Sequence, residues 1–168
     1  QCPAVSGETR SLAFKDRIPG ILKERACITA GSEPERVPLI AENLKVAQSG
    51  TTTAMFPGVH AYEQVRGSYD CGGRWENSVT VQTQLNMLAF EGQGMVHRIS
   101  PTPLLIVVPG NDILVTTASQ MATYEKAREP KQLLYIDGAG HFDIYTGDSF
   151  EQNIEGQIEF LGKWLGFS

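Results

Sequence analysis

The last third of the chain alternates between short apolar runs and amphipathic segments, and this alternation constrains the fold most strongly. Residues 103–108 are continuously apolar and rich in branched side chains, which is typical of a strand buried on both faces. A second apolar run follows at 132–136. Between the two runs, Thr117 and Gln120 have the spacing of a capping box, and Glu129-Pro130 predicts a helix end. The pattern therefore predicts strand, helix, strand.

A final helix is predicted after the second strand. Ser149 and Gln152 have capping-box spacing, and Gly166 is a typical stop. Apolar residues at helical spacing trace one face of this helix: Phe150, Ile154, Ile158, Leu161, Trp164 and Leu165. Two strands joined by a crossover helix should be parallel and right-handed. We therefore expect the α/β fold class, with this region at the edge of a doubly wound parallel sheet.

The first hundred residues do not continue the alternation. Helices are predicted at 18–30, 58–66 and 75–91, and a short strand at 37–41. This region is interpreted as a mostly helical insert placed before the last two strands.

Charge and composition exclude several classes of function. Lys and Arg number 14 against 19 Asp and Glu, and the net charge of −5 disfavours nucleic acid and anionic membranes as partners. The longest apolar stretch, at 104–108, is far shorter than the roughly 20 residues that span a bilayer. Cys2, Cys27 and Cys71 are odd in number and lack metal-ligand spacing, so neither a disulfide framework nor a zinc site is expected. A cytoplasmic location is the expectation.

Two residues at the ends of the predicted strands could carry chemistry. Asp112 follows the first strand and His141 follows the second. The carboxyl ends of adjacent parallel strands meet at one edge of the sheet, so the two side chains could touch. A carboxylate on one ring nitrogen of a histidine fixes its tautomer and lets the other nitrogen act as a general base. Taken singly, each is also an ordinary loop residue, and Asp143 is a competing acid expected to face away.

Several segments of the chain resemble a known protein family. Residues 103–112 (Pro-Leu-Leu-Ile-Val-Val-Pro-Gly-Asn-Asp) and 133–142 (Leu-Leu-Tyr-Ile-Asp-Gly-Ala-Gly-His-Phe) look like the C-terminal portion of an α/β-hydrolase. A largely fungal branch of this superfamily, whose members act in secondary metabolism, is resembled by two further segments: residues 74–80 (Arg-Trp-Glu-Asn-Ser-Val-Thr) and 127–131 (Ala-Arg-Glu-Pro-Lys). Its members are dienelactone-hydrolase-like or polyketide-transferase-type hydrolases. The resemblance implies residues 1–7 as the end of a core strand, 8–98 as a helical cap and 99–168 as hydrolase core.

The resemblance also implies a nucleophile that this sequence lacks. In the superfamily the nucleophile sits on a G-x-S-x-G elbow before the acid and the histidine. No such pentapeptide occurs here, with either Ser or Cys at its centre. Ser6, Ser68 and Cys71 are the remaining candidates, and each is better interpreted as a loop residue. Cys2 is expected beside the sheet, buried and inert.

Two functions follow as hypotheses. In the first, the chain is part of a serine-type or cysteine-type hydrolase of ester, thioester or related acyl bonds. His141 is then the base and Asp112 its partner, and no cofactor or metal is implied. The cap residues Trp75, Tyr62 and Tyr69 are candidates for contact with a small acyl substrate. In the second, the chain is a catalytically incomplete binding or interaction module. Under the first hypothesis, the missing N-terminal half of the same protein is an expected partner. Both hypotheses allow the chain to form a homo-oligomer.

Overall fold

The computed structural model describes residues 1–4, 6, 7, 15–70, 72 and 74–166. Two compact units divide the chain. One unit combines Gln1–Leu12 with Leu88–Ser168, and the other comprises Ala13–Met87. The division falls before η1 (Gln93–Arg98), whereas the sequence places the end of the insert at 98. Gln93 belongs to the same unit as α6 (Thr117–Lys126), and its side-chain amide donates to Ser119 and Thr123 of that helix.

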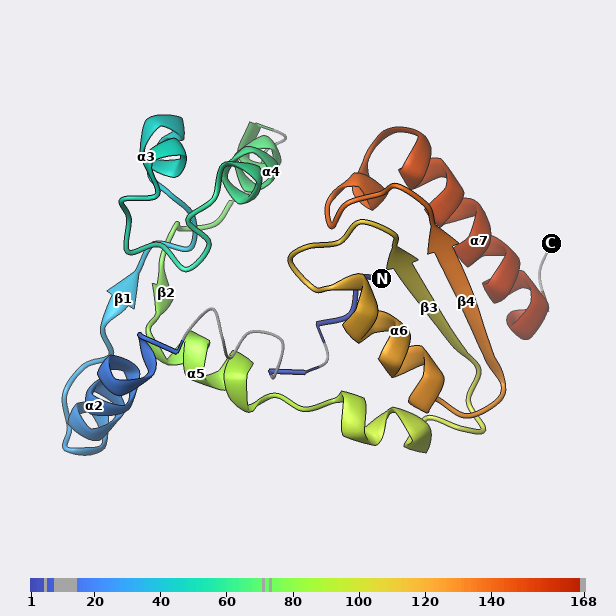
Figure 1. Ribbon diagram of the computed structural model, residues 1–168, viewed down its shortest axis with the longest axis horizontal. Coiled ribbons are helices and arrows are strands. Elements are labelled where there is room, and N and C mark those ends of the chain that lie inside the picture. Colours follow the sequence, from blue (N-terminus) through green and yellow to red (C-terminus); the bar gives the residue numbers. More distant parts are fainter. Residues whose placement is uncertain (5, 8–14, 71, 73, 167–168) are drawn as a thin grey trace. The chain divides into compact units, whose positions relative to one another are not determined.

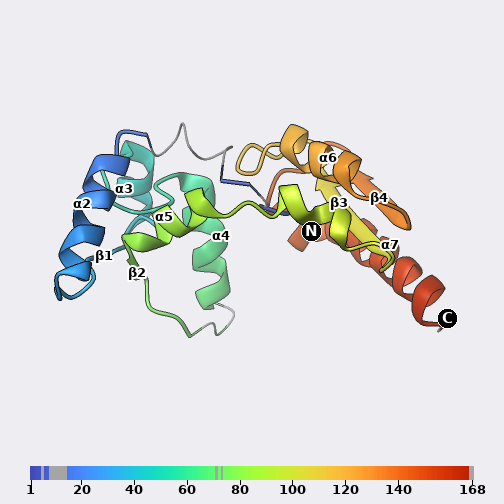
Figure 2. The same ribbon diagram turned by 90° about the horizontal axis from the view of Figure 1, so that it is seen from below.

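The unit that contains the chain's C-terminus is built on two parallel strands. β3 (Leu104–Pro109) pairs in parallel with β4 (Lys131–Ile136), with Leu104 opposite Lys131 and Pro109 opposite Ile136. The crossover helix α6 (Thr117–Lys126) lies on one side of the pair, and α7 (Gly147–Leu165) lies on the other (Figures 1 and 2). The expected order of strand, helix, strand and helix is confirmed, and helices on both faces are typical of doubly wound α/β folds.

A buried hydrophobic cluster of this unit joins the two strands to the segment that follows β4 and to Cys2. Its members are Cys2, Val107, Ile136, Ala139 and Ile144, with Leu105 and Leu134 packed against them. The backbone N–H of Cys2 donates to the carbonyl of Val107 at 3.0 Å, so the first residues run beside β3. Ser6 forms an isolated antiparallel bridge with Glu91. No strand is assigned among residues 1–4, 6 and 7, and their identity as the end of a core strand stays a prediction.

Both capping boxes predicted from the sequence are wrong. Helix α6 is capped by Thr116, whose hydroxyl accepts from the N–H of Ser119. The hydroxyl of Thr117 instead donates to the carbonyl of Pro109 at 2.7 Å. Helix α7 begins at Gly147, two residues before Ser149, without a side-chain cap. Gly166 ends α7 in the left-handed conformation, as expected (φ 75°).

The predicted apolar face of α7 is largely uncovered in this structure. Ile158 is 56% exposed and Leu165 is 68% exposed, whereas Asn153 and Phe160 are buried. A shallow hollow of about 190 Å³ is lined by Gln1, Leu105, Val107, Gln157, Phe160 and Leu161. An apolar surface of this kind is typical of a face that contacts another segment.

The other unit is mostly helical. It contains α2 (Ile18–Thr29), α3 (Leu44–Ser49), α4 (Val59–Asp70) and most of α5 (Gln82–Ala89). β1 (Arg36–Val37) and β2 (Val79–Thr80) form a two-residue antiparallel ladder. No helix in the described part of the chain is long and apolar enough to cross a membrane.

One expected helix of this unit, at 75–91, is wrong over its first half. Asn77 does not begin a helix; its Oδ1 accepts from the N–H groups of Leu39 and Ile40, and its Nδ2 donates to the carbonyl of Ile40. These bonds hold the chain extended, so β2 forms before α5 begins.

Candidate active site

Asp112 and His141 are in direct contact. Nδ1 of His141 lies 2.8 Å from Oδ2 of Asp112. Asp112 is buried, whereas the side chain of His141 is 18% exposed. The pair therefore presents one partly open ring beside a buried carboxylate, at the carboxyl ends of adjacent parallel strands. The contact expected from the sequence is present.

The loops that carry the pair are tied to each other. Gly110 follows β3, and its N–H donates to the carbonyl of Ile136 at the end of β4. The backbone N–H of Asn111 donates to Ala139, and its side-chain amide donates to the carbonyl of Gly138. Gly138 has φ +72°, a conformation that favours glycine. These bonds fix the distance between the two loops and hence between the acid and the histidine.

The carboxylate of Asp112 accepts four hydrogen bonds. Oδ1 accepts from the backbone N–H groups of Leu114 and Val115, both at 2.9 Å. Oδ2 accepts from Nε2 of Gln120 at 2.8 Å and faces His141. Burial alone would raise the pKa of Asp112, but hydrogen bonds from His141 and Val115 and the charge of His141 outweigh it and lower the pKa. Asp112 is therefore an anion at neutral pH.

An anionic Asp112 determines how His141 is protonated. A carboxylate only accepts hydrogen bonds, so Nδ1 of His141 carries the proton that faces it. Nε2 of the neutral ring is then an unprotonated acceptor. This tautomer is the one that a general base requires.

Cys2 is buried beside the pair, and Tyr145, which is 49% exposed, contacts Cys2. The thiol of Cys2 donates to the carbonyl of His141 at 3.5 Å, and its sulfur is 3.5 Å from the hydroxyl of Tyr145. Burial raises the pKa of the Cys2 thiol and raises that of Tyr145 to about 12. Both groups are therefore protonated at neutral pH, and the expectation that Cys2 is buried and unreactive agrees with its environment.

These residues also include a group that could hold a cation. One ligand atom each from Cys2, Asp112 and His141 lie within 4.8 Å of one another. A cation bound there would have to replace the hydrogen bond between Asp112 and His141 and to deprotonate Cys2.

The structure shows the hydrogen-bond partners of the competing acid, Asp143, and of one remaining nucleophile candidate, Ser6. Oδ2 of Asp143 accepts from the N–H of Gly140 at 2.7 Å, so this carboxylate closes the turn before His141. Ser6 is buried and donates to Oε2 of Glu91 at 2.7 Å. The side chain of Ser68 and all of Cys71 lie outside the described residues.

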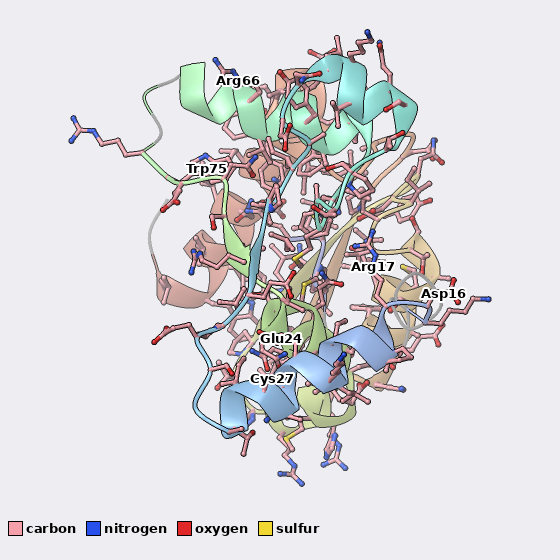
Figure 3. The ribbon with its side chains drawn as sticks, turned by 90° about the vertical axis from the view of Figure 1, so that its left-hand side faces the viewer. Asp16, Arg17, Glu24, Cys27, Arg66 and Trp75 are labelled. Atoms are coloured by element: carbon pink, nitrogen blue, oxygen red, sulfur yellow. The ribbon has the colours of Figure 1, made fainter. Side chains whose placement is uncertain are left out.

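The three candidate substrate contacts lie in the unit Ala13–Met87. Tyr62 is half-buried on α4, and Trp75 is half-buried in the segment after α4 (Figure 3). The backbone of Tyr69 belongs to α4, and its side chain lies outside the described residues. Contact of these residues with substrate stays a prediction.

Two contacts near the pair are not predicted by the sequence: the hydrogen bond from Gln120 to Asp112 and the contact of Tyr145 with Cys2. The spacing of Gln120 from Thr117 fits a capping box and predicts that role instead. Tyr145 comes four residues after His141, a spacing that one helical turn would bring onto the same side. That spacing is the one local signal for the position of Tyr145.

Comparisons with known proteins identify relatives of the chain. No protein-family model matches it. A polyketide transferase of Aspergillus fumigatus, af380, is 27% identical over 147 residues, which cover 87% of this chain and 48% of that protein. The thiohydrolase aneE of Aspergillus aculeatus is 26% identical over 170 residues, covering 95% of this chain and 52% of that protein.

The fold has a solved counterpart. The crystal structure of the α/β hydrolase GrgF from Penicillium matches with a TM-score of 0.72 and 28% identity, covering 98% of this chain and 54% of that one. The chain spans about half the length of the curated relatives it matches. Fungal polyketide transferases and thiohydrolases are thus its homologues, and it has an α/β fold of the α/β-hydrolase type, as the resemblance in the sequence predicts.

Proposed function

We propose that this chain supplies the acid and the histidine of a serine-type or cysteine-type α/β-hydrolase. The enzyme would act on ester, thioester or related acyl bonds of a small molecule. The observation that carries the proposal is the 2.8 Å contact between Nδ1 of His141 and the buried carboxylate of Asp112. Homology to hydrolases and polyketide transferases supports this class of reaction.

The proposed chemistry assigns one task to each residue. Nε2 of His141 takes the proton of a hydroxyl or thiol nucleophile as that group attacks the acyl carbon. The same nitrogen then returns the proton to the leaving group. Asp112 stabilises the imidazolium formed in between and stays ionised. Nucleophile and base together suffice for acyl transfer, so the mechanism needs neither a metal nor an organic cofactor.

The nucleophile would come from a partner segment, the missing N-terminal half that the resemblance implies. Two observations support such a partner. The sequence has no G-x-S-x-G elbow, and the chain matches only about half of its relatives. The uncovered apolar residues of α7, with the partly buried Leu105 of β3, form a surface that this segment would cover.

The unit Ala13–Met87 would act as the cap that selects the substrate. Its three candidate contacts are Trp75, Tyr62 and Tyr69. Water as the final acceptor would give hydrolysis, and a second small molecule would give acyl transfer. The names of the relatives, thiohydrolase and polyketide transferase, support both outcomes for a thioester substrate.

The test uses protein that joins this chain to the segment with the nucleophile. Hydrolysis of an acyl thioester is measured for wild type and for His141→Ala, which should lower the rate by several orders of magnitude. Asp143→Asn is the matched control, because Asp143 lies in the same loop and contacts Gly140 rather than the ring. Full turnover by His141→Ala would refute the assignment.

A second candidate function is a catalytically incomplete binding module. The observation that favours it is the exposed apolar face of α7, which suits an interaction surface. A fluorophosphonate probe for serine and a chloroacetamide probe for cysteine separate the two candidates. Labelling that is lost in His141→Ala supports the enzyme, and absence of any His141-dependent labelling supports the module, since the exposed Cys27 can react with chloroacetamide in either case.

A further inference from the structure

Gln120 is a buried polar residue that the proposed mechanism does not use. It lies on α6 and is fully buried. Its Nε2 donates to Oδ2 of Asp112 at 2.8 Å and to the carbonyl of Val115 at 2.6 Å. Its Oε1 has no hydrogen-bond partner among the described residues. An apolar side chain of the same length would fill this space without burying an unpaired oxygen.

The orientation of the amide is determined by its neighbours. Both groups that face it, the Asp112 carboxylate and the Val115 carbonyl, only accept hydrogen bonds. Rotating the amide by 180° would direct Oε1 at these two acceptors. Nε2 therefore faces Asp112, and the two N–H groups bridge the carboxylate and the loop at Val115.

This bridge fixes the direction of Oδ2. The two backbone donors, Leu114 and Val115, hold Oδ1. Gln120 fills one acceptor position of Oδ2, and the remaining position points at Nδ1 of His141. Without the amide, the partly exposed ring would be the one partner left to Oδ2 among the described residues.

We propose that Gln120 is a positioning residue, which holds the Asp112 carboxylate so that His141 keeps its proton on Nδ1. This proposal rests on the proposed function for its importance in catalysis, but the hydrogen-bond geometry is independent of any reaction. The role is positioning rather than catalytic, because Gln120 acts only through Asp112.

The experiment compares two variants of the full 168-residue chain by ¹⁵N NMR of the His141 ring. Gln120→Met keeps the length of the side chain and removes both donors. Thr123→Val is the matched control: Thr123 is also buried on α6, and its hydroxyl donates to Ser119 rather than to Asp112. Circular dichroism establishes that each variant is folded.

We expect wild type and Thr123→Val to show a single tautomer protonated at Nδ1. Gln120→Met should show a mixture in which at least a tenth of the rings are protonated at Nε2 instead. A folded Gln120→Met with the wild-type tautomer would overturn the proposal, as would an equal change in Thr123→Val.

A measurement on wild type covers the case in which Gln120→Met does not fold. The side-chain amide protons of Gln120 should exchange at least tenfold more slowly than those of Gln152, which is exposed on α7. Their signals should also shift as Asp112 is titrated in acid. Rapid exchange, or signals that ignore this titration, would overturn the proposal.

An activity measurement separates this inference from the proposed function. In the joined protein, Gln120→Met should lower kcat at least tenfold and change KM by less than about twofold. If His141→Ala leaves turnover intact, the proposed function fails while the tautomer result still decides the role of Gln120.

Discussion

Replacing Asp112 with Asn tests the hydrogen-bond arrangement at the centre of the site. The substitution keeps the shape of the side chain, and its oxygen can still accept from Leu114 and Val115. The new amide group then faces two donors, Nε2 of Gln120 and Nδ1 of His141. Two charge-assisted hydrogen bonds become contacts between donors.

The magnitude follows from these two contacts. Hydrogen bonds to a charged group contribute about 1.5–3 kcal/mol each, so about 3–6 kcal/mol is at stake. A neutral amide is less costly to bury than a carboxylate, which offsets part of the loss. Rotating the Gln120 amide would let Oε1 accept from Asn but would also turn Oε1 toward the carbonyl of Val115, so it recovers only part of the loss. We therefore expect the free energy of unfolding to fall by about 1–3 kcal/mol.

The assay is urea unfolding of the 168-residue chain at pH 7, with Asp143→Asn as control. Asp143 is exposed, and Asn can still accept from Gly140, so the control should change stability by less than about 0.5 kcal/mol. In Asp112→Asn the ring of His141 should also move its proton to Nε2, which ¹⁵N NMR detects. Unchanged stability together with an unchanged tautomer would refute the arrangement described here.

Three further predictions concern stability and association. Folding lowers the pKa of Asp112 below its unfolded pKa of about 3.9. The ionised carboxylate therefore stabilises the fold above the unfolded pKa, and this stabilisation is lost as the pH falls through the folded pKa. In urea unfolding between pH 5 and 3, wild type should lose more stability than Asp112→Asn. Gly156→Ala places Cβ 2.6 Å from Cδ2 of Leu134 and should lower the melting temperature, whereas Gly20→Ala on α2 meets open space and should raise it. The chain alone should self-associate through the α7 face in sedimentation experiments, and Leu161→Lys should shift it toward monomer; a monomeric wild type would contradict this prediction.

The sequence predicts the β3–α6–β4–α7 order because these elements follow local patterns. Branched apolar runs, a proline stop and a terminal glycine each act within a few residues. The contact between Asp112 and His141 could also be predicted, since adjacent parallel strands bring their following loops to one edge. Topology alone supplies that inference.

The errors of sequence reasoning come from contacts distant in the chain. Asn77 reads as a helix start because its true partners, Leu39 and Ile40, lie nearly forty residues earlier. Gln120 reads as a capping residue because spacing alone does not show a buried carboxylate eight residues earlier. In each case a three-dimensional partner outweighs a local preference.

The segment that carries Cys2 closes a much longer loop than the acid–histidine contact does. His141 is 29 residues from Asp112 but 139 from Cys2. The entropic cost of closing a loop rises by about 0.6 kcal/mol for each doubling of its length. Closing the loop to Cys2 therefore costs about 1.4 kcal/mol more than closing the loop between Asp112 and His141. The amino-terminal residues should therefore detach first when the chain opens locally, and hydrogen exchange at Cys2 should outpace that at Val115. The strand–helix–strand segment can thus keep its paired side chains through a partial opening that releases the start of the polypeptide.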